Sequence, residues 1–281
     1  MKKKIVSLCL VAALAATAVV GGSLAYFTDT DGAKNVMTVG NVAITQDETN
    51  EKGEPFQDGQ KLYPYTGTGA DDAANKITIN DAYYQGGVMD PAKNWISKIV
   101  TVMNDGTEDA YVRTLFAFQI LEDADGKEII AADPYTGDLA WRAQHGLNYN
   151  LYQCPGSVYF PKVNNDYVKY EDADGNKYIV GEYLYMNNGD SMLKGSATTG
   201  TVGERSHASL KSIALESYVD NDAAALYEDY KILVVSQAVQ TKGFTDDNGN
   251  GVISDDALNT AFGALAEADQ TKLEEWFANA Q

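Results

Sequence analysis

Residues 246–257, DDNGNGVISDDA, combine oxygen-bearing side chains with a tight turn in the spacing of a calcium-binding loop. Ca²⁺ prefers several oxygen ligands, which such a loop supplies from alternate positions around a glycine. Here Gly251 falls at position 6 of the loop. The candidate metal ligands at positions 1, 3, 5, 7 and 9 are Asp246, Asn248, Asn250, the carbonyl of Val252, and Ser254.

The same loop departs from the calcium pattern at position 12, where Ala257 replaces the bidentate acid. Asp255 or Asp256 would have to take over that role with poorer geometry, and the segment before the loop is strand-like. The alternative is an Asn/Gly turn that caps the following helix without a metal ion. The sequence leaves bound Ca²⁺ and a metal-free turn both open.

Recognisable catalytic motifs are missing from the sequence. The two histidines, His145 and His207, lie far apart, and neither belongs to an HExxH zinc motif. There is no GxSxG, and Cys154 lies in QCPGS, outside a recognisable cysteine-protease context. Glycosidase carboxylates leave no short signature, so a hydrolase stays a third hypothesis. The sequence predicts a protein that is not an enzyme.

The first 25 residues have the three parts of a secretory signal peptide. Lysines at positions 2–4 precede an apolar run over 5–20, and GGS at 21–23 leads to the small residue Ala25. The apolar run is shorter than the roughly 20 residues that span a bilayer. We therefore expect cleavage between Ala25 and Tyr26, export, and no retained membrane anchor.

Charge and cysteine content agree with an exported chain. Removal of residues 1–25, which contain three Lys and no acid, changes the formal charge from −19 to −22. This acidity argues against nucleic acid as a partner. It suits cations or cationic surfaces, or simply a solvated acidic surface. Only Cys154 remains after cleavage, so no intramolecular disulfide is expected.

The middle of the chain alternates apolar and polar residues, which predicts β-strands over 99–103 and 110–121. NDG between them, and EDADG at 122–126 and again at 171–175, predict hairpin turns. The two DADG segments could also bind calcium, but turns account for them without an ion. Arg113 lies inside the second strand, where it could pair with an acid across the sheet.

Two further strands are predicted within HASLKSIALESYV and YKILVVSQAVQTKGF, the second buried on both faces. The pattern is typical of a mainly β protein, an antiparallel β-sandwich or jelly roll over 26–245, with an insertion around 122–200. Residues 246–281 add a calcium-type loop and a helical tail. Its apolar faces, expected to pack on the sandwich or, for the last helix, on a partner, are Leu258, Phe262 and Leu265, then Leu273, Trp276 and Phe277.

The N-terminal stretch MKKKIVSL…GGSLAYFTDTDGAKNVMTVGNVAI resembles the export signal of the TasA/camelysin family, which the SipW-type signal peptidase of Gram-positive bacteria processes. The matching parts are GGSLA, the aromatic YFTDT, the polar DGAKN and a first strand VMTVGNVAI. The similarity continues in SKIVTVMNDGTEDAYVRTLFAF and ILVVSQAVQTKGF. Residues 122–200 and the helical tail do not match.

This resemblance implies an extracellular or cell-surface jelly-roll protein that is cut after Ala25 and assembles into biofilm matrix fibres by donor-strand exchange. The freed segment, tethered by a flexible TDTDGAKN, would pair with its own sheet or with a neighbouring copy. Partners would be further copies of the chain, or companion matrix proteins. The residues of one face of the donor strand are Val36, Thr38, Gly40, Val42 and Ile44.

Two other functions are compared with this expectation. Camelysin-type members have been described as metalloproteases, but without HExxH this activity is not expected here. A monomeric surface or secreted binding module, steadied by calcium, could share the same export route without forming fibres.

Overall fold

The computed structural model describes residues 28–31, 42–50, 52–58, 60, 62, 96–122, 124–129, 147–151, 159–185, 192–215, 225–227, 229–241, 255–278 and 280. Over these residues the protein is mainly β and antiparallel, with a short helical C-terminal segment, which confirms the predicted fold class. The jelly-roll topology itself stays a prediction. The expected signal peptide and its cleavage point, Ala25 and Tyr26, lie outside the described residues.

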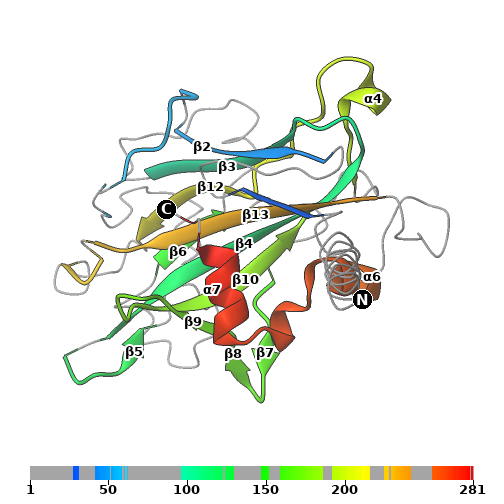
Figure 1. Cartoon of the computed structure of the whole chain (residues 1–281). Helices are drawn as coiled ribbons and strands as arrows, with labels where there is room; N and C mark the ends of the chain where they lie inside the picture. Colours follow the sequence, from blue (N-terminus) through cyan, green and yellow to red (C-terminus); the bar gives the residue numbers. More distant parts are fainter. Residues whose placement is uncertain are drawn as a thin grey trace, which may run out of the picture.

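The strands form two main antiparallel sheets and one small hairpin (Figure 1). The seven-stranded sheet runs β1 (Thr28–Asp31), β13 (Ile232–Gln240), β4 (Ala110–Glu122), β10 (Lys177–Leu184), β9 (Lys169–Glu171), with β5 (Glu128–Ile129) and β11 (Met192–Leu193) also paired to β4. The four-stranded sheet runs β2 (Ile44–Thr49), β3 (Ile96–Asn104), β12 (Leu210–Leu215), β6 (Leu147–Leu151). The hairpin consists of β7 (Lys162–Val163) and β8 (Asp166–Tyr167).

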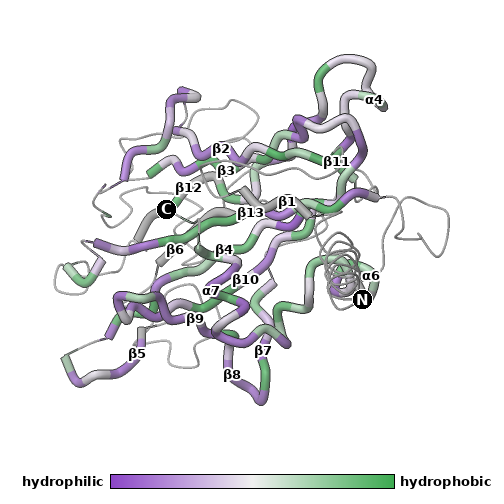
Figure 2. Tube along the Cα trace, viewed as in Figure 1, coloured by the Kyte–Doolittle hydropathy of each residue, from purple (hydrophilic) through white to green (hydrophobic). Residues whose placement is uncertain are grey.

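The two main sheets share a hydrophobic core. Apolar residues of β3 and β12, including Val100 and Leu210, pack in one cluster with Phe116 and Phe118 of β4 and Val234 of β13. Figure 2 shows apolar residues running along β4 and β13 in the centre of the molecule. Because successive side chains of a strand point to opposite faces, the other face of β4 needs a different cover.

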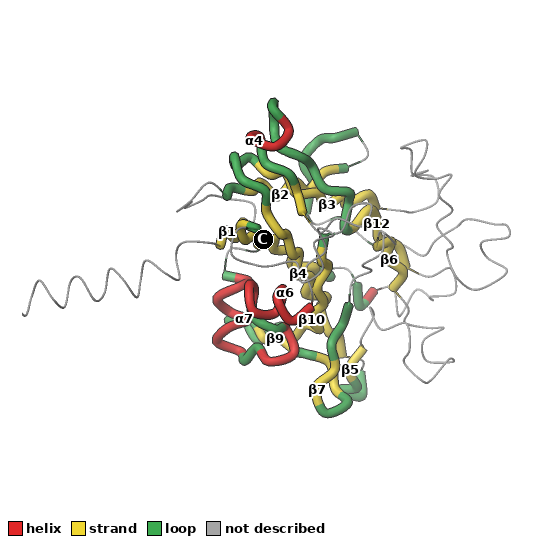
Figure 3. Tube along the Cα trace, turned by 90° about the vertical axis from the view of Figure 1, so that its right-hand side faces the viewer, coloured by secondary structure: helices red, strands yellow, loops and turns green. Residues whose placement is uncertain are grey.

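The C-terminal helices provide this second cover, as the sequence predicts. Helix α6 (Asp255–Phe262), a 3₁₀ turn η2 (Leu265–Glu267) and helix α7 (Gln270–Phe277) follow one another, and α7 begins after Asp269, whose side chain accepts a hydrogen bond from the Lys272 amide. Figure 3 shows these helices on one side of the seven-stranded sheet and β12 and β6 on the other. The apolar residues expected to pack on the sandwich are all buried: Leu258, Phe262, Leu265, Leu273, Trp276 and Phe277.

The prediction that NDG makes a hairpin is wrong, because β3 and β4 belong to different sheets. Asn104 is fully buried and organises a corner between the sheets. Its Nδ2 donates to the carbonyls of Glu108 and Leu193, each at 2.9 Å, and its Oδ1 accepts from the Gly106 amide at 2.9 Å. The carbonyl of Leu193 comes from the segment just before the short helix α4 (Ser196–Thr199). The hydrogen bonds of the Asn104 side chain thus hold the connection between β3 and β4, where a hairpin would have main-chain pairing between the two strands.

Both EDADG segments form the predicted hairpin turns. Glu122 of β4 pairs with Glu128 of β5, and Glu171 of β9 pairs with Lys177 of β10. The glycines of the two turns have φ of 76° and 83°, a left-handed conformation that glycine adopts without steric cost.

The predicted insertion around 122–200 is in large part integral to the sandwich. β10 pairs with β4 along its whole length, from Lys177↔Ile120 to Leu184↔Arg113. Its residues 178–181 are buried, because one face meets the other sheet and the other face meets the C-terminal helices. This segment is therefore part of the core of the fold.

Candidate functional site

Strand β1 lies at the edge of the seven-stranded sheet, immediately after the expected cleavage site. It pairs antiparallel with β13 from Thr28↔Val239 to Asp31↔Ser236. The sequence predicts a flexible tether over these residues, and the structure corrects that prediction over 28–31. The β-branched threonines at alternate positions suit an extended strand. The N-terminal segment therefore has an acceptor edge within its own chain.

The predicted donor strand lies only in part within the described residues. Val36, Thr38 and Gly40 fall outside them. Val42 and Ile44 are buried in the chain's own core beside Val102 and Val112. Ile44 also begins β2, which pairs with β3 from Ile44↔Asn104 to Thr49↔Ile99. These two residues consequently belong to the sandwich, and the strand of this region extends past the predicted end.

A row of buried, hydrogen-bonded polar side chains links β2 to β13 and β4. Gln46 is 6 % exposed, and its Nε2 donates to the carbonyl of Val234 at 3.3 Å. Its Oε1 accepts from the Ser236 hydroxyl at 2.7 Å, and Ser236 in turn lies 2.9 Å from the Thr114 hydroxyl. Gln46 thus bridges the two sheets at the edge of β13, next to the end of β1.

The chain of contacts continues from Gln46 to a buried lysine. Gln46 Nε2 also donates to Glu48 Oε1 at 3.0 Å, and the other carboxylate oxygen of Glu48 pairs with Lys98. Lys98 is only 4 % exposed, and its ammonium lies 4.3 Å from the centre of the Phe56 ring. An inward-pointing charged pair on an edge strand is one way in which proteins discourage edge-to-edge association.

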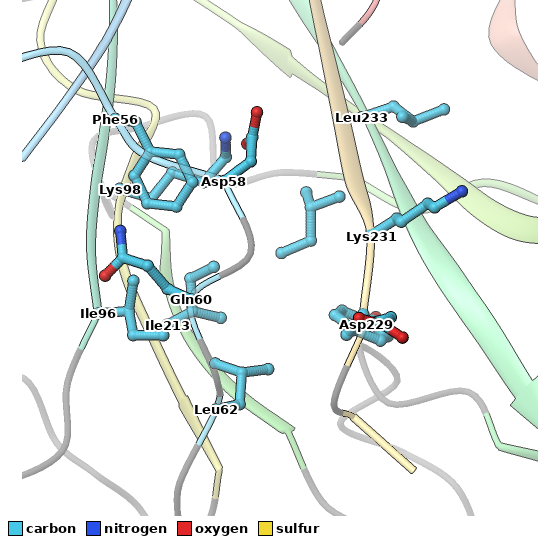
Figure 4. A pocket seen from close by; sticks show the side chains of 12 residues that line it. Phe56, Asp58, Gln60, Leu62, Ile96, Lys98, Ile213, Asp229, Lys231 and Leu233 are labelled. Carbon is cyan, nitrogen blue, oxygen red and sulfur yellow. The ribbon is translucent and has the colours of Figure 1, made fainter. Parts of the chain in front are cut away.

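A cavity of about 340 Å³ opens between the sheets beside the beginning of β13 (Figure 4). Phe56, Leu62, Ile96 and Ile213 lie on one side of it, and Lys231 and Leu233 on the other. Its walls are mostly apolar, with Lys98, Asp58, Asp229 and Lys231 as charged groups. A cavity of this size and composition suits an apolar group with a few polar anchors.

A second buried cluster surrounds Arg113, on the face of β4 that the helices cover. The guanidinium donates to Gln237 Oε1, to the Glu182 carboxylate at 3.2 Å, and to the carbonyls of Phe262 and Gly263. Pairing of this arginine with an acid across the sheet is thereby confirmed. Burial lowers the pKa of Arg113 to about 10, although Glu182 opposes the shift. The cluster fixes the end of α6 to the sheet and leaves the guanidinium enclosed.

The remaining sequence-predicted sites lie outside the described residues. This holds for the calcium-loop residues Asp246, Asn248, Asn250, Val252 and Ser254, and for His145 and Cys154. Within the part of the chain that the structure describes, no group of three or more His, Cys, Asp and Glu is placed to hold a metal ion. In the same part, no helix has the length and apolar character needed to cross a membrane.

No protein family, curated protein or solved structure matches this chain. The feature that remains for a function is the side of β13 that faces away from β4. The N-terminal strand β1 pairs with part of it, the Gln46 side chain bonds to Val234, and the cavity lies beside its first residues. Neither Gln46 nor β1 could be recognised from local sequence, because ITQDET and TDTD are both polar.

The turn between β9 and β10 depends on the carboxylate of Asp172. One oxygen accepts from the amides of Asp174 and Asn176, and the other accepts from the Asn176 side chain and the Tyr178 hydroxyl at 2.8 and 2.9 Å. Burial alone would raise the pKa of Asp172, but these hydrogen bonds outweigh it and hold the pKa below its ordinary value of 3.8.

Because the folded pKa of Asp172 is lowered, its stabilising effect is complete above pH 3.8 and is lost as the pH falls through the folded value. We expect Asp172→Asn to reduce the free energy of unfolding by about 1 kcal/mol at neutral pH. The difference from the wild type should shrink in urea unfolding at about pH 3. Asp174→Asn, at an exposed position of the same turn, is the control; a difference for Asp172→Asn that does not change with pH would contradict the prediction.

Proposed function

We propose that this protein is an exported, non-catalytic structural subunit of an extracellular matrix, and that it assembles through its N-terminal strand. The observation that carries the proposal is the position of β1, which occupies the edge of β13 two residues after the expected cleavage site. The resemblance of the N-terminus to TasA/camelysin export signals supports export from a Gram-positive bacterium and processing by a SipW-type peptidase.

Strand exchange between copies requires no new kind of contact. A pairing made within one chain can be made with the same register between two copies, which is the low-cost route of domain swapping. The described β1 contributes only four residues to this pairing, so the intramolecular form has a small contact to lose. Before cleavage, the apolar leader would hold this end away from a neighbour. Cleavage at Ala25 would therefore release the strand for other copies or for companion matrix proteins.

A monomeric binding module is the second candidate function. The cavity of about 340 Å³ beside β13 favours it, because an apolar site with charged anchors can hold a ligand without assembly. In that case the pairing of β1 with its own chain would be permanent. The calcium loop, where Asp246→Ala should lower thermal stability only in the presence of calcium, would steady either form.

The test compares mature chains 26–281 and 42–281 by electron microscopy and size-exclusion chromatography. The shorter chain keeps Val42 and Ile44, which the core requires, and lacks β1. We expect filaments from the longer chain and folded monomers from the shorter one. Circular dichroism of both chains controls for folding. Folded monomers from both would overturn assembly through this strand and leave the binding module.

A further inference from the structure

The outer edge of β13 is covered in three different ways along its length. β1 pairs with residues 236–239, the Gln46 side chain bonds to Val234, and the cavity borders the first two residues, 232 and 233, together with 229–231 just before the strand. Among the residues that the structure describes, no strand other than β1 and β4 pairs with β13. Less than half of this edge is therefore covered by main chain of a described strand.

The Gln46 amide makes the contact that the main chain of a longer strand would make. The N–H and C=O of one residue point to the same side of a strand, and the side alternates along the chain. The Lys231 carbonyl accepts from Gln119 of β4, whereas the Val234 carbonyl accepts from Gln46. Ile232 has the same parity as Val234, so its N–H and C=O face the same outer edge, and the residue lines the cavity.

The register of β1 can be continued along this edge. Asp31 pairs with Ser236, so residues 32–35 of an incoming chain would lie opposite residues 235–232. The segment TDTDGAKN, residues 28–35, would then match the edge from Val239 to Ile232. The neighbouring cavity gives the added strand room between the sheets. An extended strand in this position must replace the Gln46 amide at the Val234 carbonyl.

We propose that Gln46 is a removable cover of the β13 edge: it closes the edge in the monomer, and segment 28–35 of a second copy displaces it during assembly. This inference rests on the proposed function, whose acceptor site it specifies. Displacement of Gln46 has a modest cost, because Ser236 and Glu48 each keep another polar contact, with Thr114 and Lys98 respectively.

The test measures filament growth of the mature chain 26–281 by light scattering and electron microscopy. Gln46→Leu removes the competing amide at similar volume, so we expect growth about tenfold faster than that of the wild type, the change that roughly one lost hydrogen bond produces. Ile232→Pro removes the outward N–H without interrupting the ladder with β4, and should suppress growth. Hydrogen exchange should show new protection of the Ile232 and Val234 amides in wild-type filaments.

Asp172→Asn is the control for simple destabilisation, since its turn lies at the far edge of the sheet, beyond β10. If this control accelerates growth as much as Gln46→Leu does, or if Gln46→Leu grows at the wild-type rate, the inference is overturned while wild-type filaments still support the proposed function. If no variant and no wild-type chain forms filaments, the proposed function itself fails.

Discussion

Replacement of Arg113 by leucine is expected to lower the free energy of unfolding by about 3–5 kcal/mol. The arginine is 1 % exposed, and its removal takes a hydrogen-bond donor from Gln237 Oε1 and from two carbonyls at the end of α6, and takes the paired positive charge from Glu182. Buried acceptors that lose a charged partner bear the full cost of their desolvation. Urea unfolding followed by far-ultraviolet circular dichroism measures the change.

Arg205→Ala is the matched control for this experiment. Arg205 also pairs with a carboxylate, that of Asp47, but both side chains are partly exposed, at 49 % and 35 %, in contrast to the enclosed Arg113. Exposed ion pairs of this kind contribute at most about 1 kcal/mol. Arg113→Lys should fall between the two, because one ammonium cannot reach all the acceptors that the planar guanidinium serves. Equal losses for Arg113→Leu and Arg205→Ala would contradict the structural role of the buried cluster.

The long apolar elements of the fold could be predicted from the sequence. The alternating run over 110–121 and the apolar run within YKILVVSQAVQTKGF form β4 and β13 at the expected positions. Burial on both faces is predicted only for β13, and β4 is buried on both faces as well. The two C-terminal helices follow from the spacing of their apolar residues. EDADG also predicts its own turns, because aspartate and glycine favour the required backbone locally. In each case the deciding interactions lie within a short segment.

The candidate site could not be predicted because its contacts join distant segments. β1 is a polar TDTD whose partner in β13 lies more than 200 residues away in sequence. Gln46 is buried only because Val234 and Ser236 meet it from the opposite sheet. Asn104 makes a corner in place of a hairpin because it bonds to Leu193, which no pattern around NDG reveals. Polar residues with long-range partners leave no periodic signal.

Helix α7 of the C-terminal tail packs on the outer face of the seven-stranded sheet and also contacts the buried cluster around Arg113. Trp276 is 6 % exposed and packs with Leu115, Tyr178 and Val235 of the sheet. Its ring also lies 4.6 Å from the guanidinium carbon of Arg113. This packing satisfies the apolar face of α7 within the chain itself, where the sequence left docking on a partner as an alternative.

Trp276→Ala is accordingly expected to lower the free energy of unfolding by about 3–5 kcal/mol, the cost typical of deleting a large buried aromatic side chain. Thr271→Ala, at an exposed position of the same helix, should change it by less than about 0.5 kcal/mol. Because the ring and the guanidinium are in contact, the Arg113→Leu and Trp276→Ala losses should not add, and a double-mutant cycle should give a coupling of about 0.5–3 kcal/mol. Strict additivity, or a loss at Trp276 as small as that at Thr271, would mean that the tail does not depend on this contact in solution. A free tail would then expose the apolar outer face of the seven-stranded sheet, and the variant should aggregate through that face.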